Sequence, residues 1–189
     1  MSGRNKPTPI LHLFGDIDIP MSRRVYKIFN MLEQEGMKEV LIVLNSLGGS
    51  IDNAFAIYDR LIMSPVISTV LATGDVCSAA LIILQGGTKR LSTPNCQFMA
   101  HPIRGSTFKG TREEILAEVN DAVSTTNQMF DTFAQHSLVS YDEWHKRCYN
   151  THYYFTSSDA VSMGIVDGIM KKGVALPRYT ARQTKRRKK

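Results

Sequence analysis

A chain of 189 residues, 43% of them hydrophobic and 21% charged, has the length and composition of one globular domain and is short for two. No stretch approaches the roughly 18 apolar residues needed to span a bilayer, and the basic residues near the N-terminus precede no apolar signal segment. We therefore expect a soluble, cytoplasmic protein.

The formal net charge of +6 is concentrated at the C-terminus. Residues 171–189 contain nine Lys or Arg and no acidic residue, so the rest of the chain holds fourteen basic residues against seventeen acidic ones. This segment has too few apolar residues to fold alone. A run of charge without interleaved aromatic side chains is weak evidence for specific nucleic-acid binding. We interpret it as a solvated, disordered tail.

Three cysteines, Cys77, Cys96 and Cys148, are odd in number and lack the CxxC spacing of zinc sites. This pattern fits buried thiols in a reducing compartment and argues against a disulfide framework. We expect no metal and no cofactor.

The first half of the chain alternates between strand and helix patterns. Residues 10–14 form a short apolar strand, and the apolar spacing from Ser22 predicts a helix that ends near Gly36. A β-branched run at 39–44 predicts a strand that is covered on both faces. A helix with an apolar face at 54–62 and a strand at 66–72 follow. Such alternation predicts an α/β fold of repeated βαβ units with right-handed crossovers.

The second half contains shorter elements and one long helix. After a buried helix around 81–84 and a turn at 85–90, we expect a strand at 96–100 that ends before His101. Thr111-Arg-Glu-Glu114 is a capping-box pattern that opens a long amphipathic helix, with an apolar stripe from Ile115 to Phe133. We expect one domain of this size to leave part of that stripe uncovered, and we therefore expect a homo-oligomer. The remaining expected elements are a helix from 140 to 148, a strand at 153–155, a helical turn at 156–164 and a strand at 165–169.

Ser78 follows the strand at 66–72 and precedes the buried helix. A strand-to-helix turn can hold a hydroxyl at the mouth of a site while the first backbone N–H groups of the helix face an anion formed there. Serine is also a favoured N-cap, so this position alone favours an ordinary helix cap. Gly48-Gly49 and His101 lie just after two other predicted strands, at the edge where open α/β sheets place their sites. The coincidence of all three favours a functional site.

The chain contains a series of ordered motifs: Asn45-Ser-Leu-Gly-Gly-Ser50, Ala56-Ile-Tyr-Asp59, Gly74-x-x-x-Ser78, Pro94-Asn95, Met99-x-His101-Pro102 and Gly164-Ile-Val-Asp167. Together they resemble those of the proteolytic subunit of the Clp protease, a serine peptidase family with the ClpP/crotonase fold. The similarity covers about residues 10 to 169, so we expect an N-terminal segment at 1–9, a single peptidase domain with a long protruding helix at 10–170, and the tail at 171–189.

This resemblance implies that Ser78 is the nucleophile and His101 the general base, and that the backbone N–H groups of Gly49 and Ala79 form the oxyanion hole. It also implies an endopeptidase that hydrolyses unfolded protein inside a chamber of stacked rings, with an ATP-driven unfoldase as partner. Neither a membrane nor a nucleic acid is expected as a partner. Cys77 is a rival nucleophile, but it precedes the motif serine by one residue and should point away from the site.

The chain departs from the family pattern at the third member of the triad. Its acidic residue would fall near Tyr149-Asn150, where no acid stands. Asn150 could orient the imidazole through its amide oxygen, Asp142 or Asp159 could reach the site, or the site could be weak. The loop after His101 and the short N-terminal segment also differ from the family, which leaves the substrate-receiving strand and unfoldase docking open. The alternative functions are a crotonase-like acyl-CoA enzyme and a non-catalytic structural ring subunit.

Overall fold

The structure is a computed structural model that describes residues 7–103, 110–149, 151–170 and 173. Its strands are β1 (Ile10–Phe14), β2 (Glu39–Ser46), β3 (Ile67–Cys77), β4 (Lys89–Ser92), β5 (Gln97–Ala100), β6 (Tyr153–Thr156) and β7 (Gly168–Ile169). Its helices are α1 (Ile19–Gln34), α2 (Ile51–Ile62), α3 (Ala79–Gln85), α4 (Arg112–Gln135), α5 (Tyr141–Arg147) and α6 (Ser157–Ser162). Within the described ranges, no helix is long and apolar enough to cross a membrane.

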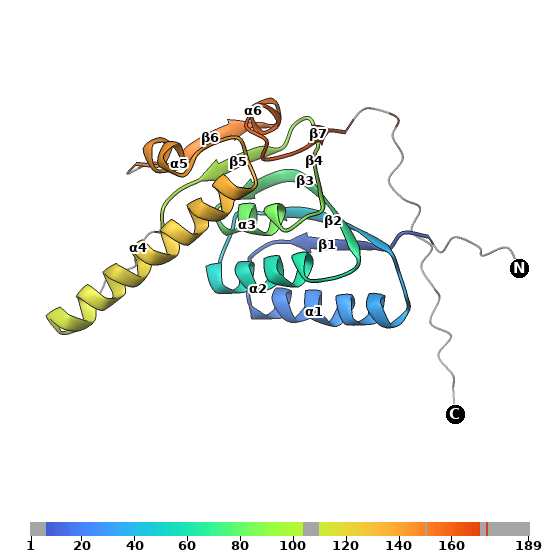
Figure 1. The fold of residues 1–189 in the computed structure, drawn as a ribbon, viewed down its shortest axis with the longest axis horizontal. Coiled ribbons are helices and arrows are strands. Elements are labelled where there is room, and N and C mark those ends of the chain that lie inside the picture. Colours follow the sequence, from blue (N-terminus) through green and yellow to red (C-terminus); the bar gives the residue numbers. More distant parts are fainter. Residues whose placement is uncertain (1–6, 104–109, 150, 171–172, 174–189) are drawn as a thin grey trace, which may run out of the picture.

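The strands form one sheet in the order β1-β2-β3-β4-β7, and every pairing on this path is parallel. The two parts of the long strand β3 pair with different strands. Residues 69–72 pair with β4, whereas residues 75–77 pair with β5. Strand β6 then pairs antiparallel with β5 (Figure 1). The end of β3 therefore lies beside the end of β5, which places Ser78 and His101 on neighbouring strands.

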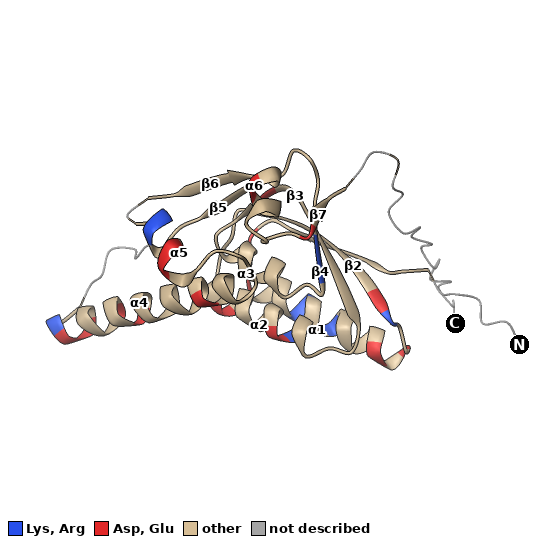
Figure 2. Ribbon diagram, turned by 45° about the horizontal axis from the view of Figure 1, so that its top comes forward, with Lys and Arg blue, Asp and Glu red and all other residues tan. Residues whose placement is uncertain are grey.

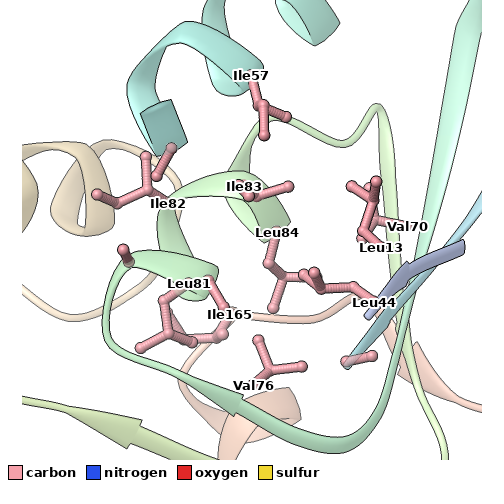
Figure 3. Close-up of a cluster of buried hydrophobic side chains, with 14 of the residues drawn as sticks. Leu13, Leu44, Ile57, Val70, Val76, Leu81, Ile82, Ile83, Leu84 and Ile165 are labelled. Atoms are coloured by element: carbon pink, nitrogen blue, oxygen red, sulfur yellow. The ribbon is translucent and has the colours of Figure 1, made fainter. Parts of the chain in front are cut away.

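Helices α1, α2 and α3 cover one face of the main sheet (Figure 1). All seven residues of α3 are buried, because the helix packs between the sheet and the other elements around it. Figure 3 shows its Leu81, Ile83 and Leu84 among side chains of the strands, α2 and the segment that contains Ile165. A smaller apolar cluster around Leu41 occupies the other face. The element that begins directly after Ser78 is thus the most deeply buried of the described helices.

Helix α4 begins at the expected capping box, in which Thr111 and Glu114 satisfy each other's backbone N–H groups. Its 24 residues span about 36 Å. Only the second half is packed, against α3 and α5, and its buried residues lie between 126 and 133. The first half extends away from the sheet (Figure 1) and exposes Leu116 and Val123. The prediction of a long protruding helix is therefore confirmed.

Four sequence predictions needed correction. Helix α1 begins at Ile19 instead of Ser22, because Asp18 accepts a hydrogen bond from the N–H of Met21 at 2.8 Å and caps the helix. Strand β3 continues past Gly74 to Cys77, since the Asn45 side chain accepts a bond from the N–H of Asp75 and supports the irregular register there. The turn expected at 85–90 overlaps β4. The last strand is shorter than predicted and covers residues 168–169.

Arg90 ties β4 to three other parts of the chain, which the polar sequence of β4 did not suggest. Its guanidinium donates to the Gln85 side chain and to the His136 carbonyl at 2.6 Å each, and to Asp167 at 2.8 Å. The imidazole of His136 in turn forms a 2.7 Å hydrogen bond with the hydroxyl of Tyr58. This network joins α2 and α3 to the end of α4 and to the segment before β7.

We expect stability to fall as the pH drops from 7.5 to 5, in part because of His136. Burial lowers the pKa of this imidazole, and the charge of Arg90 lowers it further. The unfolded chain takes up a proton near pH 6.5, whereas the folded chain takes it up only at lower pH. The contribution of His136 to the free energy of unfolding is therefore fully present above about pH 6.5 and is lost progressively below it. Urea unfolding of wild type and His136→Gln at both pH values checks this: the variant should lose less stability, and equal losses would contradict it.

Candidate active site

Ser78 has a backbone conformation that an ordinary helix cap does not require. Its φ of 55° and ψ of −125° make it the single non-glycine residue with positive φ in the described part of the chain. It occupies the N-cap position of α3, yet its hydroxyl makes no capping hydrogen bond. Its backbone N–H instead donates to the Met99 carbonyl at 2.7 Å. Such strain costs about 1–3 kcal/mol and is concentrated at functional sites. The geometry favours a nucleophile elbow over a cap.

Gly48 lies directly against Ser78. A Cβ built on Gly48 would be 2.9 Å from the Cβ of Ser78 and 3.3 Å from its Oγ, and the φ of Gly48 is 113°. The hydroxyl of Ser46 accepts a hydrogen bond from the Gly48 N–H at 3.0 Å, and the Gly48 carbonyl accepts one from Ile17 at 2.9 Å. Glycine is needed here because any side chain would push Ser78 away.

Gly49 is held by a parallel bridge to Ile17. A Cβ on Gly49 would be 2.5 Å from the carbonyl oxygen of Ile17, and the φ of Gly49 is 144°. The bridge uses the carbonyl of Gly48 and the N–H of Ser50, so the Gly49 N–H has no acceptor among the described residues. The N–H of Ala79, the first of α3, likewise has no acceptor in that part of the structure. One of these donors directly follows Ser78 in sequence, and the other belongs to the residue after Gly48, which lies against Ser78.

His101 follows β5, and the β3–β5 register aligns Cys77 with Met99. The structure thus brings Ser78 and His101 to the same edge of the sheet. The ring nitrogen Nδ1 of His101 lies 2.6 Å from the Pro102 carbonyl oxygen. Because a carbonyl can only accept, Nδ1 carries the proton and Nε2 carries the lone pair of a base. A hydrogen bond between the Ser78 hydroxyl and this imidazole is not among the described contacts; in sites without substrate such bonds are often long.

Cys77 is a poor rival for the nucleophile. Its side chain is buried, and burial raises the pKa of the thiol to about 11, with a smaller contribution from Asp75. The thiol is therefore protonated at neutral pH and unreactive. The three cysteines are free and buried, as their spacing predicted.

The carboxylates considered for the third position do not act together with His101. Asp159 accepts hydrogen bonds from the N–H and hydroxyl of Thr156 at 2.9 and 2.7 Å, which lowers its pKa and commits it to the α6 capping box. Asp159 is thus eliminated as the orienting acid. Asp142 is exposed in the first turn of α5, and none of its described contacts involves His101. Tyr149 is 78% exposed, and Asn150 lies outside the described residues.

The sequence analysis missed His152. Its ring meets that of His101 with centroids 5.1 Å apart and planes at 72°. The antiparallel register aligns Ala100 with Tyr153, so the next pair along the ladder is His101 and His152. Strand pairing between 97–100 and 153–156 would have revealed this neighbour, but periodicity alone does not specify which strands pair.

A cavity of about 370 Å³ opens beside the residues that follow His101. It is lined by Pro102 and Ile103, by apolar side chains of α4, and by α5. The hydroxyl of Thr126 accepts a hydrogen bond from the N–H of Ile103 at 3.1 Å, which ties the loop to α4. The cavity therefore keeps a fixed position next to the candidate base.

The sequence profile of the Clp protease family matches residues 6–173. The chain belongs to the Clp protease family. The fold agrees: a mutant of ClpP1 from Listeria monocytogenes superposes with a TM-score of 0.79 at 24% identity, covering 87% of this chain and 92% of that one. The predicted ClpP-like α/β fold is thus confirmed, and so is the prediction of a Clp-type peptidase. The acyl-CoA and structural-subunit alternatives are not favoured.

Proposed function

We propose that this Clp protease family member is a serine endopeptidase in which Ser78 is the nucleophile and His101 the general base. The strained conformation of Ser78 carries the proposal, because it withdraws the hydroxyl from capping and places it over Gly48. The N–H groups of Gly49 and Ala79, which have no acceptor among the described residues, support an oxyanion hole. Each such donor stabilises the transition state by about 3 kcal/mol.

The reaction follows from these positions. As the Ser78 Oγ attacks the peptide carbonyl carbon, Nε2 of His101 accepts the hydroxyl proton. The carbonyl oxygen becomes an oxyanion that accepts hydrogen bonds from Gly49 and Ala79. The imidazolium then donates its proton to the leaving amine, and an acyl-enzyme remains. Water attacks this ester by the same route, which returns the proton to Ser78 and releases the carboxylic acid.

A fluorophosphonate probe tests this function without knowledge of the substrate, since it reacts with an activated serine. Peptide mapping of the labelled wild-type protein should locate the adduct on Ser78. A protein that stays unlabelled and does not hydrolyse fluorogenic peptides would contradict the proposal.

The cavity beside His101 suits an apolar substrate side chain next to the scissile bond. We expect Ala122→Phe, which adds a ring to the cavity wall, to lower kcat/KM for peptides with Leu or Met at that position by about tenfold. Peptides with Ala there should be affected less. Ser124→Phe is the matched control, because Ser124 is exposed on α4 and does not line the cavity. An equal loss for all peptides, or an equal loss in the control, would contradict this assignment.

We propose that the first half of α4 packs against other copies of the chain in a ring assembly. Its exposed Leu116, Val119 and Val123 lie on successive turns and lack a cover within the described residues. Light scattering should report a particle several times larger than the 21.2 kDa chain. A 21.2 kDa particle across salt and protein concentrations would contradict the proposal.

Substrate access is proposed to follow the family: unfolded protein enters an inner chamber, with an ATP-driven unfoldase as partner. The three free, buried thiols suit a reducing compartment such as the cytoplasm.

A further inference from the structure

We propose that His152 is the positioning residue of the His101 base, an inference that rests on the proposed function. The two rings meet edge to face, at 5.1 Å between centroids and 72° between planes. This separation lies within the range of attractive aromatic pairs. In a serine peptidase triad the orienting group accepts the Nδ1–H of the imidazole. Here the Pro102 carbonyl accepts it, and His152 contacts the ring itself.

The strand pair fixes this contact. Strands β5 and β6 align Phe98 with Phe155, and their rings stack 5.2 Å apart in the core. A slip of one residue would turn these rings out of the core, so the register is rigid. The ring of Tyr154 also contacts the His152 ring: their centroids are 6.0 Å apart and their planes meet at 87°. His152 is therefore held on two sides and is presented opposite His101.

Two of the described contacts restrain the His101 ring. The Pro102 carbonyl receives the Nδ1–H and sets the tautomer, while His152 restricts rotation of the ring. Neither supplies negative charge. The titratable side chains whose rings contact His152 in the described elements are His101 and Tyr154. Strands β5 and β6 carry no charged side chain, and their ribbons are tan throughout in Figure 2. Position 152 therefore supplies orientation, but no negative charge, to the imidazolium that forms at His101 during catalysis.

Substitutions at position 152 separate these two effects. His152→Ala should lower kcat about tenfold with KM unchanged, because the base loses its packing partner. His152→Phe should restore most of kcat, since it keeps the ring contact. His152→Asp should raise kcat above wild type by about tenfold or more and move the acid limb of the kcat/KM–pH profile up by about one pH unit, because a carboxylate stabilises the imidazolium. His12→Asp makes the same charge change at an exposed position of β1 and should leave both the kcat and the pH limb unchanged.

Fluorophosphonate labelling of wild-type Ser78 reports the proposed function separately. If Ser78 is labelled while His152→Ala stays within twofold of wild type and His152→Asp leaves the pH limb in place, the positioning role is overturned and the proposed function stands. Loss of kcat in His152→Ala without rescue by Phe, together with a lower melting temperature, also overturns it and indicates a structural role. An unlabelled, inactive wild type overturns both.

Discussion

Replacing Ser78 with Ala is expected to abolish fluorophosphonate labelling and to lower peptide turnover by about 10³-fold or more. The hydroxyl supplies the electrons of the new bond, and neither the oxyanion donors nor His101 can replace it. Alanine meets the same steric penalty as serine at a φ of 55°, and the Ser78 hydroxyl makes no cap bond. The thermal unfolding temperature should therefore change little, so the loss will report chemistry and not folding.

Cys77→Ala is the matched control for this experiment. The Cys77 thiol is buried and protonated at neutral pH, with a pKa of about 11, so removing it should leave labelling of Ser78 intact. Iodoacetamide at pH 7.5 should leave Cys77 unmodified in the folded protein. If an adduct on Cys77 competes with the fluorophosphonate probe, the nucleophile is the Cys77 thiol and not the Ser78 hydroxyl.

Gly48→Ala is expected to lower turnover by about 100-fold, with a smaller effect on stability. The new Cβ would lie 2.9 Å from the Cβ of Ser78, so the serine must move away from the oxyanion donors. Gly49→Ala should lower the free energy of unfolding more than Gly48→Ala does. Its Cβ would lie 2.5 Å from the Ile17 backbone and break the bridge. We expect that change to cost about 2–4 kcal/mol of unfolding free energy.

Gly36→Ala separates backbone strain from crowding at the site. Gly36 also has positive φ, at 63°, but a Cβ there meets no atom within 4 Å, and the residue ends α1 far from Ser78 in sequence. This variant should lose about 1 kcal/mol of stability and keep its kcat. Initial rates and urea unfolding, measured on the three variants together, check this. Full activity in Gly48→Ala would show that Ser78 does not depend on the glycine turn.

The elements with strong patterns were predictable. A continuous β-branched run predicted β2, and a capping box predicted the start of α4, because each pattern has one dominant physical cause. Strand β4 was not predictable. Its four residues are mostly polar and are held by Asp167, which is distant in sequence. Local propensity carries no information about such a partner.

The candidate site likewise contains features that sequence patterns predict and features that they do not. Ser78, His101 and the glycine pair could be found, since each follows a strand pattern and the carboxyl ends of parallel strands share an edge. The role of His152 depends on the pairing of β5 with β6, and the positive φ of Ser78 depends on how β3 meets α3. Both arise from tertiary geometry, so residue spacing alone did not predict them.

The complete burial of α3 has a consequence for the order in which the molecule opens. Backbone amides exchange with solvent water when their segment opens, and the most deeply packed elements open last. Ser78 directly precedes such an element, whereas the first half of α4 makes few packing contacts within the described chain. In the isolated chain, the first half of α4 is therefore expected to fray while the geometry around Ser78 persists. Ser78, the proposed nucleophile, is then expected to keep its arrangement until the whole domain unfolds.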